Sequence, residues 1–424
     1  MHSDPETPKL ILRHARAMLG ANTRPEECEI AIGHDGRISA IASSIKPAPP
    51  SQVVDLDGRL VVPGLIDVHQ HLDKTRTRDA APNPDGTLAG AVRAFNTYAQ
   101  TVSADDIVDR AEATVNACVA RGTTTIRTHV NVGPGSGLKG LEAISTLRER
   151  TADRVRLQVV ALIPPDANSV RRWTSQAVAF GIGAIGGAPA HADDSETFLT
   201  AIFDEAERHA LDVDLHLDEH LNHARHFFHQ LADMTIARGM QGRVVAGHCS
   251  ALGALSLSQA QPICDAFANA GIGVIALPAA NLYLLGRDFD ALIPRGITRV
   301  HSLARAGVNV ACGSDNIQDA FVPTGTGDLL ELARWTMLAG HFDDFASAFN
   351  MVTAAPARMM RITDHGIRVG ARADLLITPA EDVADLVASG PLDRTVLYGG
   401  GCVAGCLSLQ KGCGNGGRAL STDR

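Results

Sequence analysis

The sequence predicts an α/β protein in which a (β/α)8 TIM barrel is combined with a small β-sandwich domain formed from both chain termini. Strand-like and helix-like segments alternate for roughly eight units over about 290 residues, which is typical of parallel strands closed into a barrel. Short strand patterns flank this region at both ends of the chain. The alternative is a doubly wound open sheet, which is disfavoured because no G-x-G-x-x-G phosphate loop follows the first strand of the region.

The strands near the N-terminus are short and separated by turns. Alternating or β-branched patterns predict strands at residues 10–12, 29–32 and 38–41, and H-D-G-R at residues 34–37 is typical of a hairpin. Strand patterns return at residues 373–378 and 395–398. The simplest arrangement pairs the last segment with the first. We therefore predict a β-sandwich domain of residues 1–62 plus 368–424 and a barrel domain of residues 63–367 inserted between them.

The barrel segments follow from the period of their apolar residues. The run Val61-Val62 indicates entry to a first buried strand, and the motif of residues 64–73 continues it. Further strands are expected at residues 121–130, 155–163, 184–187, 212–217, 244–247, 273–277 and 308–312. Helices are expected at residues 87–99, 104–120, 138–149, 170–180, 197–209, 223–238, 258–270, 299–306 and 328–340. Ser103 is expected to cap the second of these helices.

Composition and charge restrict the class of protein. The 424 residues are 45% hydrophobic and 20% charged, which is typical of a soluble globular protein. A formal charge of −9 without a Lys/Arg cluster argues against nucleic acid as a partner. No apolar run is long enough to span a membrane, and the N-terminus lacks the pattern of a secretory signal. We expect no membrane association.

The eight cysteines lack a regular spacing, which favours reduced thiols in a cytoplasmic protein over a disulfide framework. Cys402, Cys406 and Cys413 cluster near the C-terminus, where a metal site is conceivable. The Gly-rich surroundings and the lack of a nearby histidine favour a frayed tail instead.

Two histidines end the first predicted barrel strand, in G-L-I-D-V-H-Q-H-L-D at residues 64–73. Side chains alternate across a strand, so His69 and His71 point to the same face. Two imidazoles side by side can each give a ring nitrogen to one divalent metal ion. The alternative is a pair of ordinary polar histidines at a strand end, and H-x-H alone does not exclude it.

Other polar residues lie where later barrel strands end. They are His216, Asp218, Glu219 and His220 after one strand, His248 after the next, and Asp315 in A-C-G-S-D-N after the last. In a barrel these ends face one shared mouth. Nitrogen and oxygen donors of this kind suit Zn²⁺ or Fe²⁺, which lowers the pKa of a bound water toward neutrality. Glu219 is placed to shuttle protons to a leaving nitrogen. Together these positions predict a metal-dependent hydrolase.

Several motifs also identify a family. They are P-G-L-I-D-V-H-Q-H-L-D-K, R-T-H-V-N-V, H-L-D-E-H, A-G-H-C-S, G-I-T-R-V and G-S-D-N-I-Q-D. Together they strongly resemble the amidohydrolase superfamily in its cytosine-deaminase-like branch, from about residue 9 to the strand at residues 395–398. The resemblance implies a distorted (β/α)8 barrel with a β-sandwich, and one divalent metal ion (Zn or Fe) per subunit.

The resemblance also implies roles for individual residues. It makes His69, His71, His216 and Asp315 the metal ligands. It makes Glu219 the proton shuttle to the ring nitrogen, His248 the residue that orients or activates the water, and Asp315 the acceptor of that water's proton. Two-metal members use a bridging lysine where this chain has His129, so one ion is expected and His129 is expected to pack behind the ligands. His220, His223, His226 and His229 are expected on a solvated helix rather than at a second metal.

The substrate pocket departs from the family pattern. Leu88, Pro164, Asn316 and Phe321 are expected to contact the substrate. Pro164 takes the position of the glutamine that cytosine deaminases use, and proline has no side-chain hydrogen-bond donor. Asn316 replaces the second aspartate of their Asp-Asp pair. S-D-N-I-Q-D resembles instead the branch that hydrolyses N-alkylated triazine amines, although that branch lacks a residue like Glu219. Cytosine itself is therefore not the expected substrate.

The sequence thus predicts an aminohydrolase that cleaves an exocyclic C–N bond of a small nitrogen heterocycle. Hydrolysis of a cyclic or acyl amide is the alternative on the same scaffold, and release of ammonia or amine rather than a new carboxylate separates the two. A non-catalytic barrel that binds a small ligand is a third alternative, and a lack of bound metal would favour it. The sequence leaves open the substrate, the choice between Zn and Fe, and whether the chain forms a homo-oligomer.

Overall fold

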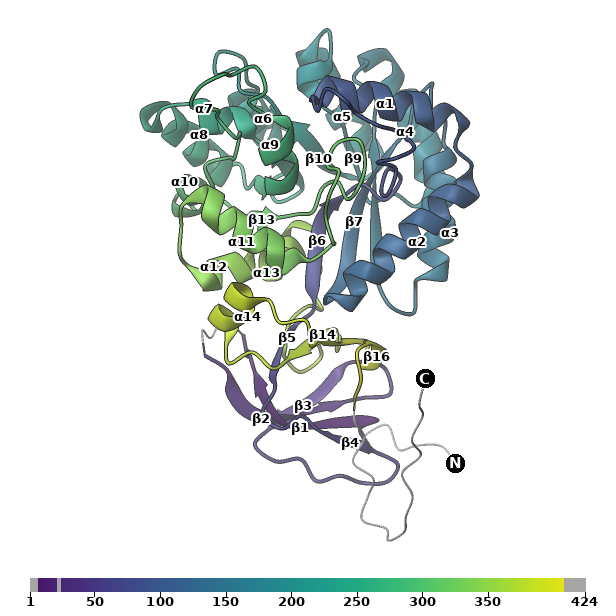
Figure 1. The fold of residues 1–424 in the computed structure, drawn as a ribbon, viewed down its shortest axis with the longest axis vertical. Helices are drawn as coiled ribbons and strands as arrows, with labels where there is room; N and C mark the ends of the chain where they lie inside the picture. Colours follow the sequence, from purple (N-terminus) through teal and green to yellow (C-terminus); the bar gives the residue numbers. More distant parts are fainter. Residues whose placement is uncertain (1–6, 21–23, 408–424) are drawn as a thin grey trace.

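The computed structural model describes residues 7–20 and 24–407, and within them it has two eight-stranded sheets (Figure 1). One sheet is parallel and lies at the centre of a ring of helices. The other is mixed and is built from strands of both chain ends. The predicted combination of a (β/α)8 barrel with a β-unit formed from both termini is therefore confirmed.

The parallel sheet runs in chain order around the barrel. Its strands are β6 (Leu65–Gln70), β7 (Thr123–Asn131), β8 (Arg156–Leu162), β9 (Ala184–Gly186), β10 (Asp212–Leu217), β11 (Val244–His248), β12 (Gly273–Ala276) and β13 (Val310–Cys312). Each strand pairs in parallel with the next one along the chain. A parallel bridge between Gln70 and Asp315 then joins the first strand to the segment after the last. The sheet is a nearly closed barrel, so its strand ends converge on one mouth.

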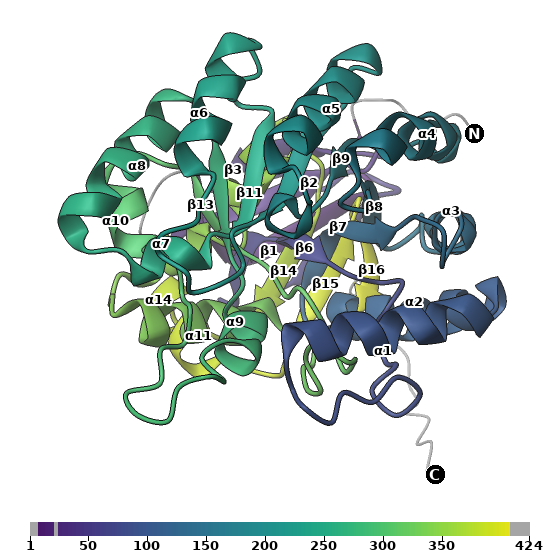
Figure 2. The same cartoon turned by 90° about the horizontal axis from the view of Figure 1, so that it is seen from above.

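Helices surround the barrel, as the view from above shows (Figure 2). They are α1 (Leu88–Thr101), α2 (Ala104–Ala120), α3 (Lys139–Arg150), α4 (Ala167–Ala177), α5 (Ser195–Arg208), α6 (Phe228–Ala237), α7 (Ser250–Ala254), α8 (Leu257–Asn269), α9 (Pro278–Leu284), α10 (Val300–Arg305), α11 (Leu329–Gly340), α12 (Phe345–Asn350), α13 (Ala354–Met359) and α14 (Val383–Ser389). The Ser103 hydroxyl accepts from the Asp106 amide at 3.1 Å, so the expected cap of α2 is present. Among the helices of the described residues, none combines the length and apolarity needed to cross a membrane.

The mixed sheet lies at the opposite end of the molecule from the barrel mouth (Figure 1). Its strands are β1 (Leu10–Ala17), β2 (Glu26–Ile32), β3 (Ile38–Ala42), β4 (Gln52–Asp55), β5 (Leu60–Pro63), β14 (Leu375–Thr378), β15 (Thr395–Tyr398) and β16 (Gly401–Ala404). The N-terminal strand β5 pairs antiparallel with the C-terminal strand β14. The Arg394 guanidinium makes two 2.9 Å contacts with the Asp328 carboxylate at the start of α11, and this buried ion pair ties the sheet to the barrel.

Three local predictions were wrong. Val61 and Val62 belong to β5 of the mixed sheet, and the first barrel strand starts only at Leu65. The helix predicted from residue 223 begins at Phe228, because the Asp218 carboxylate accepts from the Phe227 amide at 2.8 Å and holds the preceding segment as a loop. The helix predicted at residues 170–180 is α4, which ends at Ala177 and is followed by one 3₁₀ turn.

The exact domain limits stay a prediction, and residues 408–424, with Cys413, lie outside the described part of the chain. The described cysteines are free thiols, of which Cys402 and Cys406 are exposed and the others buried.

Candidate active site

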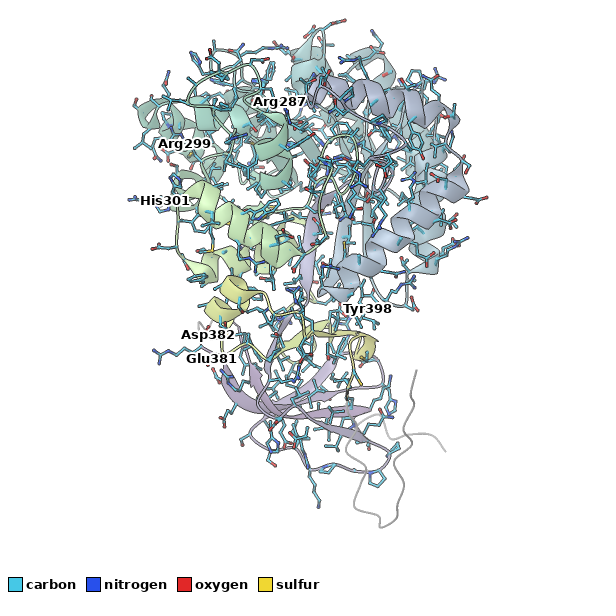
Figure 3. The ribbon with its side chains drawn as sticks, in the orientation of Figure 1. Arg287, Arg299, His301, Glu381, Asp382 and Tyr398 are labelled. Atoms are coloured by element: carbon cyan, nitrogen blue, oxygen red, sulfur yellow. The ribbon has the colours of Figure 1, made fainter. Side chains whose placement is uncertain are left out.

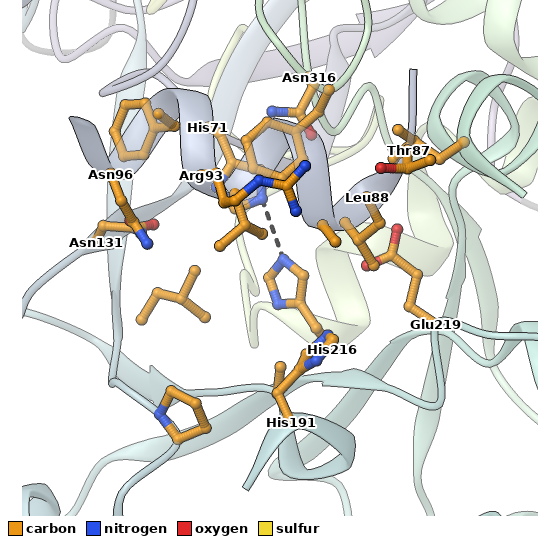
Figure 4. Close-up of a pocket in the computed structure, with 18 of the residues that line it drawn as sticks. His71, Thr87, Leu88, Arg93, Asn96, Asn131, His191, His216, Glu219 and Asn316 are labelled. Carbon is orange, nitrogen blue, oxygen red and sulfur yellow. Dashed lines mark hydrogen bonds between the residues drawn. The ribbon is translucent and has the colours of Figure 1, made fainter. Parts of the chain in front are cut away.

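Four side chains from three barrel segments converge at the mouth. His69 and His71 come from β6 and the residue after it, His216 from β10, and Asp315 from the loop after β13. One potential ligand atom from each lies within 4.8 Å of the others. His71 Nε2 is 3.1 Å from His216 Nε2 (Figure 4). The same His71 atom is 3.2 Å from Asp315 Oδ1. We call these four residues the ligand group.

The backbone fixes the ligand group firmly. The Asp315 amide donates to the His69 carbonyl at 2.8 Å, and the His71 amide donates to the Asp315 carbonyl at 2.9 Å. Asp315 itself has a φ of 60°, a left-handed conformation that a non-glycine residue adopts at a cost. Gly313 makes the close approach feasible, since a Cβ there would lie 3.0 Å from both the Cβ and the carbonyl oxygen of His69. The chain therefore holds these side chains before any ligand arrives.

The ligand group fits a divalent cation. Both ring nitrogens of His69 and the Oδ1 atom of Asp315 are buried without a hydrogen-bond partner. Burial lowers the pKa of His216 well below its usual value, and the other histidines lower it further. Burial opposes ionisation of Asp315, but its contacts with His69 and His71 hold the pKa of this carboxyl well below its usual range. Neutral imidazoles and one carboxylate are the donors that Zn²⁺ and Fe²⁺ accept.

Glu219 and His248 lie beside the ligand group. His248 Nδ1 is 3.4 Å from Glu219 Oε1, and His248 Nε2 is 3.9 Å from Asp315 Oδ2. Asn281 on α9 also contacts His248 Nδ1, at 3.1 Å. Burial, reinforced by the Asp315 charge, raises the pKa of Glu219 well above its usual value. A carboxyl that holds its proton next to the ligand group is suited to general acid catalysis.

A cavity of about 1160 Å³ opens above the ligand group, and we call it the central cavity. It is lined by His71, His216 and Asp315 together with Glu219 and His248. Each of the four residues predicted to contact substrate, Leu88, Pro164, Asn316 and Phe321, also lines it. Arg287 also lines the cavity. Figure 3 shows Arg287 at the barrel end of the molecule, whereas Asp382 and Tyr398 lie toward the mixed sheet.

A second group of potential ligands lies behind the first. His129 stacks on His69 with ring centroids 3.9 Å apart, and its Nε2 atom is 3.5 Å from Asp214 Oδ1. His69, His129 and Asp214 are close enough together to hold an ion. The Arg127 guanidinium, however, is 2.7 Å from the other Asp214 oxygen and is fully buried. This fixed positive charge disfavours a cation beside Asp214.

Several polar residues singled out by the sequence lie apart from the ligand group. Asp218 turns back to the Phe227 amide, and His220 lines the central cavity without joining the ligand group. His223 lies in the loop before α6, and His229 on α6 is exposed.

Sequence reasoning missed other polar residues at the site. Asn281 carries no motif, and its contact with His248 follows only from the course of α9. Asp67 lies two residues before His69, and its carboxylate accepts from the Ser314 hydroxyl at 2.5 Å and from Gln70 at 3.1 Å. Burial raises the pKa of Asp67 to about 6. The spacing of Asp67 and His69 on one strand face was a usable indication of this network.

Asp319 gives the site a predicted dependence of stability on pH. Burial raises its pKa to about 7, although the carboxylate accepts from the Val322 and Phe321 amides and from Asn316. The folded state thus holds this proton more tightly than the unfolded state, so the stabilisation is complete at low pH and is lost as the pH rises to about 7. Between about pH 5 and about pH 8, the wild type should lose about 2–3 kcal/mol more unfolding free energy than Asp319→Asn. Urea titrations of both proteins measure this, and parallel pH curves would contradict the assignment.

The chain is similar in sequence to known hydrolases of carbon–nitrogen bonds. A model of the amidohydrolase family matches residues 52–141 and 75–399. A pterin deaminase of Rhizobium rhizogenes is 33% identical over 361 residues, which cover 83% of this chain and 82% of that protein. N-isopropylammelide isopropyl amidohydrolase of Pseudomonas sp. (strain ADP) is 27% identical over 360 residues, covering 80% of this chain and 85% of that protein.

Solved structures with the same fold include 5-methylcytosine deaminase from Klebsiella pneumoniae with bound 5-fluorocytosine. It superposes with a TM-score of 0.85 at 26% identity and covers 98% of this chain and 99% of that one. N-isopropylammelide isopropylaminohydrolase from Burkholderia multivorans superposes with a TM-score of 0.79 at 29% identity, covering 93% of this chain and 98% of that one.

Proposed function

This chain belongs to the amidohydrolase family and is a hydrolase of carbon–nitrogen bonds other than peptide bonds, and on that premise we propose its reaction. We propose that it is a metal-dependent deaminase that removes an exocyclic amine from a small nitrogen heterocycle. The observation that carries this proposal is the position of Glu219, whose side chain is 10% exposed and which lies beside the ligand group in the same cavity. Relatives that deaminate pterin and 5-methylcytosine support it.

The proposed cofactor is one divalent ion, Zn or Fe, held by His69, His71, His216 and Asp315. When bound, the ion would lower the pKa of a water molecule, so that a hydroxide nucleophile would be available at neutral pH. Two features support a single ion: Arg127 already neutralises Asp214, and His129 stands where a bridging lysine would be required. A cytoplasmic location and a homo-oligomeric state stay predictions.

The side chains of the chain divide the proton transfers among them. Water attacks the sp² carbon that carries the amino group, and Asp315 takes the proton that the water loses. His248, 3.9 Å from Asp315 and held by Asn281, orients the water. Glu219 delivers a proton to the ring nitrogen, which lets the tetrahedral carbon form. The proton on Asp315 then passes to the leaving nitrogen, and the C–N bond breaks with release of ammonia or an amine. The Glu219 carboxylate takes the remaining hydroxyl proton from the former tetrahedral carbon, which leaves an oxo heterocycle and restores the acid.

The central cavity favours a substrate larger than a single pyrimidine. Its volume of about 1160 Å³ is somewhat above the roughly 300–1,000 Å³ that is usual for small-molecule sites. We propose a fused bicyclic aminoheterocycle of the pterin type, held by contacts with Leu88, Pro164, Asn316 and Phe321. The apolar surfaces of Leu88 and Phe321 suit the flat faces of such a ring system.

The test is ammonia release from a panel of aminopteridines, aminopyrimidines and aminotriazines. Enzyme loaded with Zn²⁺ or Fe²⁺ is expected to release ammonia or amine from at least one of them, and chelation is expected to abolish the release until metal is restored. Turnover that survives removal of the metal would refute the proposal. A new carboxylate in the product, in place of an oxo group on an intact ring, would show amide hydrolysis instead.

A further inference from the structure

Lys74 is a buried cation in the central cavity for which the reaction above has no use. Its exposed fraction is 3%, and it lines the cavity three residues beyond His71. Its Nζ atom lies 5.3 Å from the ring centre of Phe95 and 5.4 Å from that of Phe321. Among the described residues, no Asp or Glu oxygen comes within the 4.0 Å of an ion pair with Nζ. A buried ammonium without a counter-charge is costly unless a ligand completes its contacts.

The one short contact of Nζ does not satisfy it. Nζ is 2.7 Å from Nδ1 of His71, and the same Nδ1 atom is 3.2 Å from the His129 carbonyl oxygen. When Nε2 of His71 acts as a ligand, a neutral ring carries its hydrogen on Nδ1 and donates to that carbonyl. The Lys74 ammonium, which is a donor only, then faces another donor. It must find its acceptor elsewhere.

The direction left for that acceptor is the central cavity. The rings of Phe95 and Phe321 cover the ammonium on other sides. Asn316, which lines the same cavity, already donates one of its two Nδ2 hydrogens to Asp319 at 2.6 Å, and its amide carries no charge. Pro164, also in the lining, has no side-chain donor. Among the lining residues, Lys74 is therefore the buried cationic donor that is available to a ligand.

We propose that Lys74 binds an oxo oxygen of the substrate and so selects amino-oxo heterocycles, in which a ring carbonyl accompanies the amine to be removed. This inference rests on the proposed function and narrows its substrate class. A ring carbonyl presents the lone pairs that the ammonium requires, whereas an amino group at the same ring position presents hydrogens. The same contact draws electrons toward the carbonyl and makes the ring more electrophilic.

The experiment compares two fluorescent probes that differ at one position: pterin, with an oxo group at C4, and 2,4-diaminopteridine, with an amine there. Binding is measured with metal-loaded Glu219→Gln protein, which should not turn the probes over, with and without Lys74→Met. We expect Lys74→Met to weaken pterin binding about 10- to 100-fold. Affinity for 2,4-diaminopteridine should not fall. Lys74→Arg should keep part of the preference, and Lys46→Met, on the exposed surface, should change neither affinity.

The outcomes separate this inference from the proposed function. Equal weakening of both probes with unchanged metal content, or no change for either, would overturn the role of Lys74. If the protein with Lys74→Met does not hold metal, the test uses the Glu219→Gln protein with Lys74 intact. Equal affinity of this protein for the two probes, or no binding of pterin, would overturn the proposal. Failure of the proposed function looks different: the wild type would bind pterin in a Lys74-dependent way but release no ammonia from it.

Discussion

His216→Ala should lose its metal ion and, with it, about 10⁴-fold or more of the hydrolytic rate. The Nε2 atom of His216 is 3.1 Å from the Nε2 atom of His71. His216 is the member of the ligand group that β10 supplies. Without it, only the donors of β6 and the loop after β13 remain. The measurements are metal content per chain after dialysis and kcat for the substrate found in the panel.

The matched control is His229→Ala, which removes an exposed histidine from α6 and leaves the ligand group intact. It should keep both metal and activity. The role of His216 would be wrong if His216→Ala retained a full equivalent of metal and the wild-type kcat.

Glu219→Gln should lower kcat by about 10²–10⁴-fold while the metal content stays unchanged. Glutamine fills the same space and can still contact His248, whose Nδ1 atom lies 3.4 Å from the carboxyl, but it cannot deliver a proton. The loss should fall on kcat much more than on KM, because proton transfer occurs in the transition state.

Glu149→Gln, on the exposed surface of α3, provides the control for the same chemical change and should leave kcat unaltered. If Glu219→Gln kept kcat within about threefold of the wild type, a proton shuttle at this position would be excluded.

The sequence predicted the barrel well because its strands are apolar and its helices are regular. The 104–120 helix, for example, has a capping serine, a periodic apolar face and a glycine after its end, and α2 follows it residue for residue. Short helices such as α9 and α14 were not predicted, since seven residues carry too little periodicity. The prediction of a helix from residue 223 failed because the Phe227 amide donates to the Asp218 side chain, nine residues earlier, and this local hydrogen bond outweighed helix propensity.

At the site, the predictable residues were those whose place at a strand end is set by topology. His69, His216 and Asp315 needed only the order of strands in a barrel to be brought together. The contacts of Lys74 and Asn281 could not be predicted in this way. They depend on the side-chain direction of a loop residue and on the position of a short helix, and neither has a characteristic spacing.

The pairing of β5 with β14 also has a consequence for synthesis on the ribosome. Leu60 and Thr378 are neighbours in the mixed sheet although about 300 residues separate them, a long loop to close in folding. At about 5–20 residues per second, roughly 15–60 s pass between the emergence of these two strands. All barrel strands are made within this interval, while one edge of β5 waits without its partner. We expect the nascent chain to close its barrel first, and to bury that edge only once β14 to β16 have been translated.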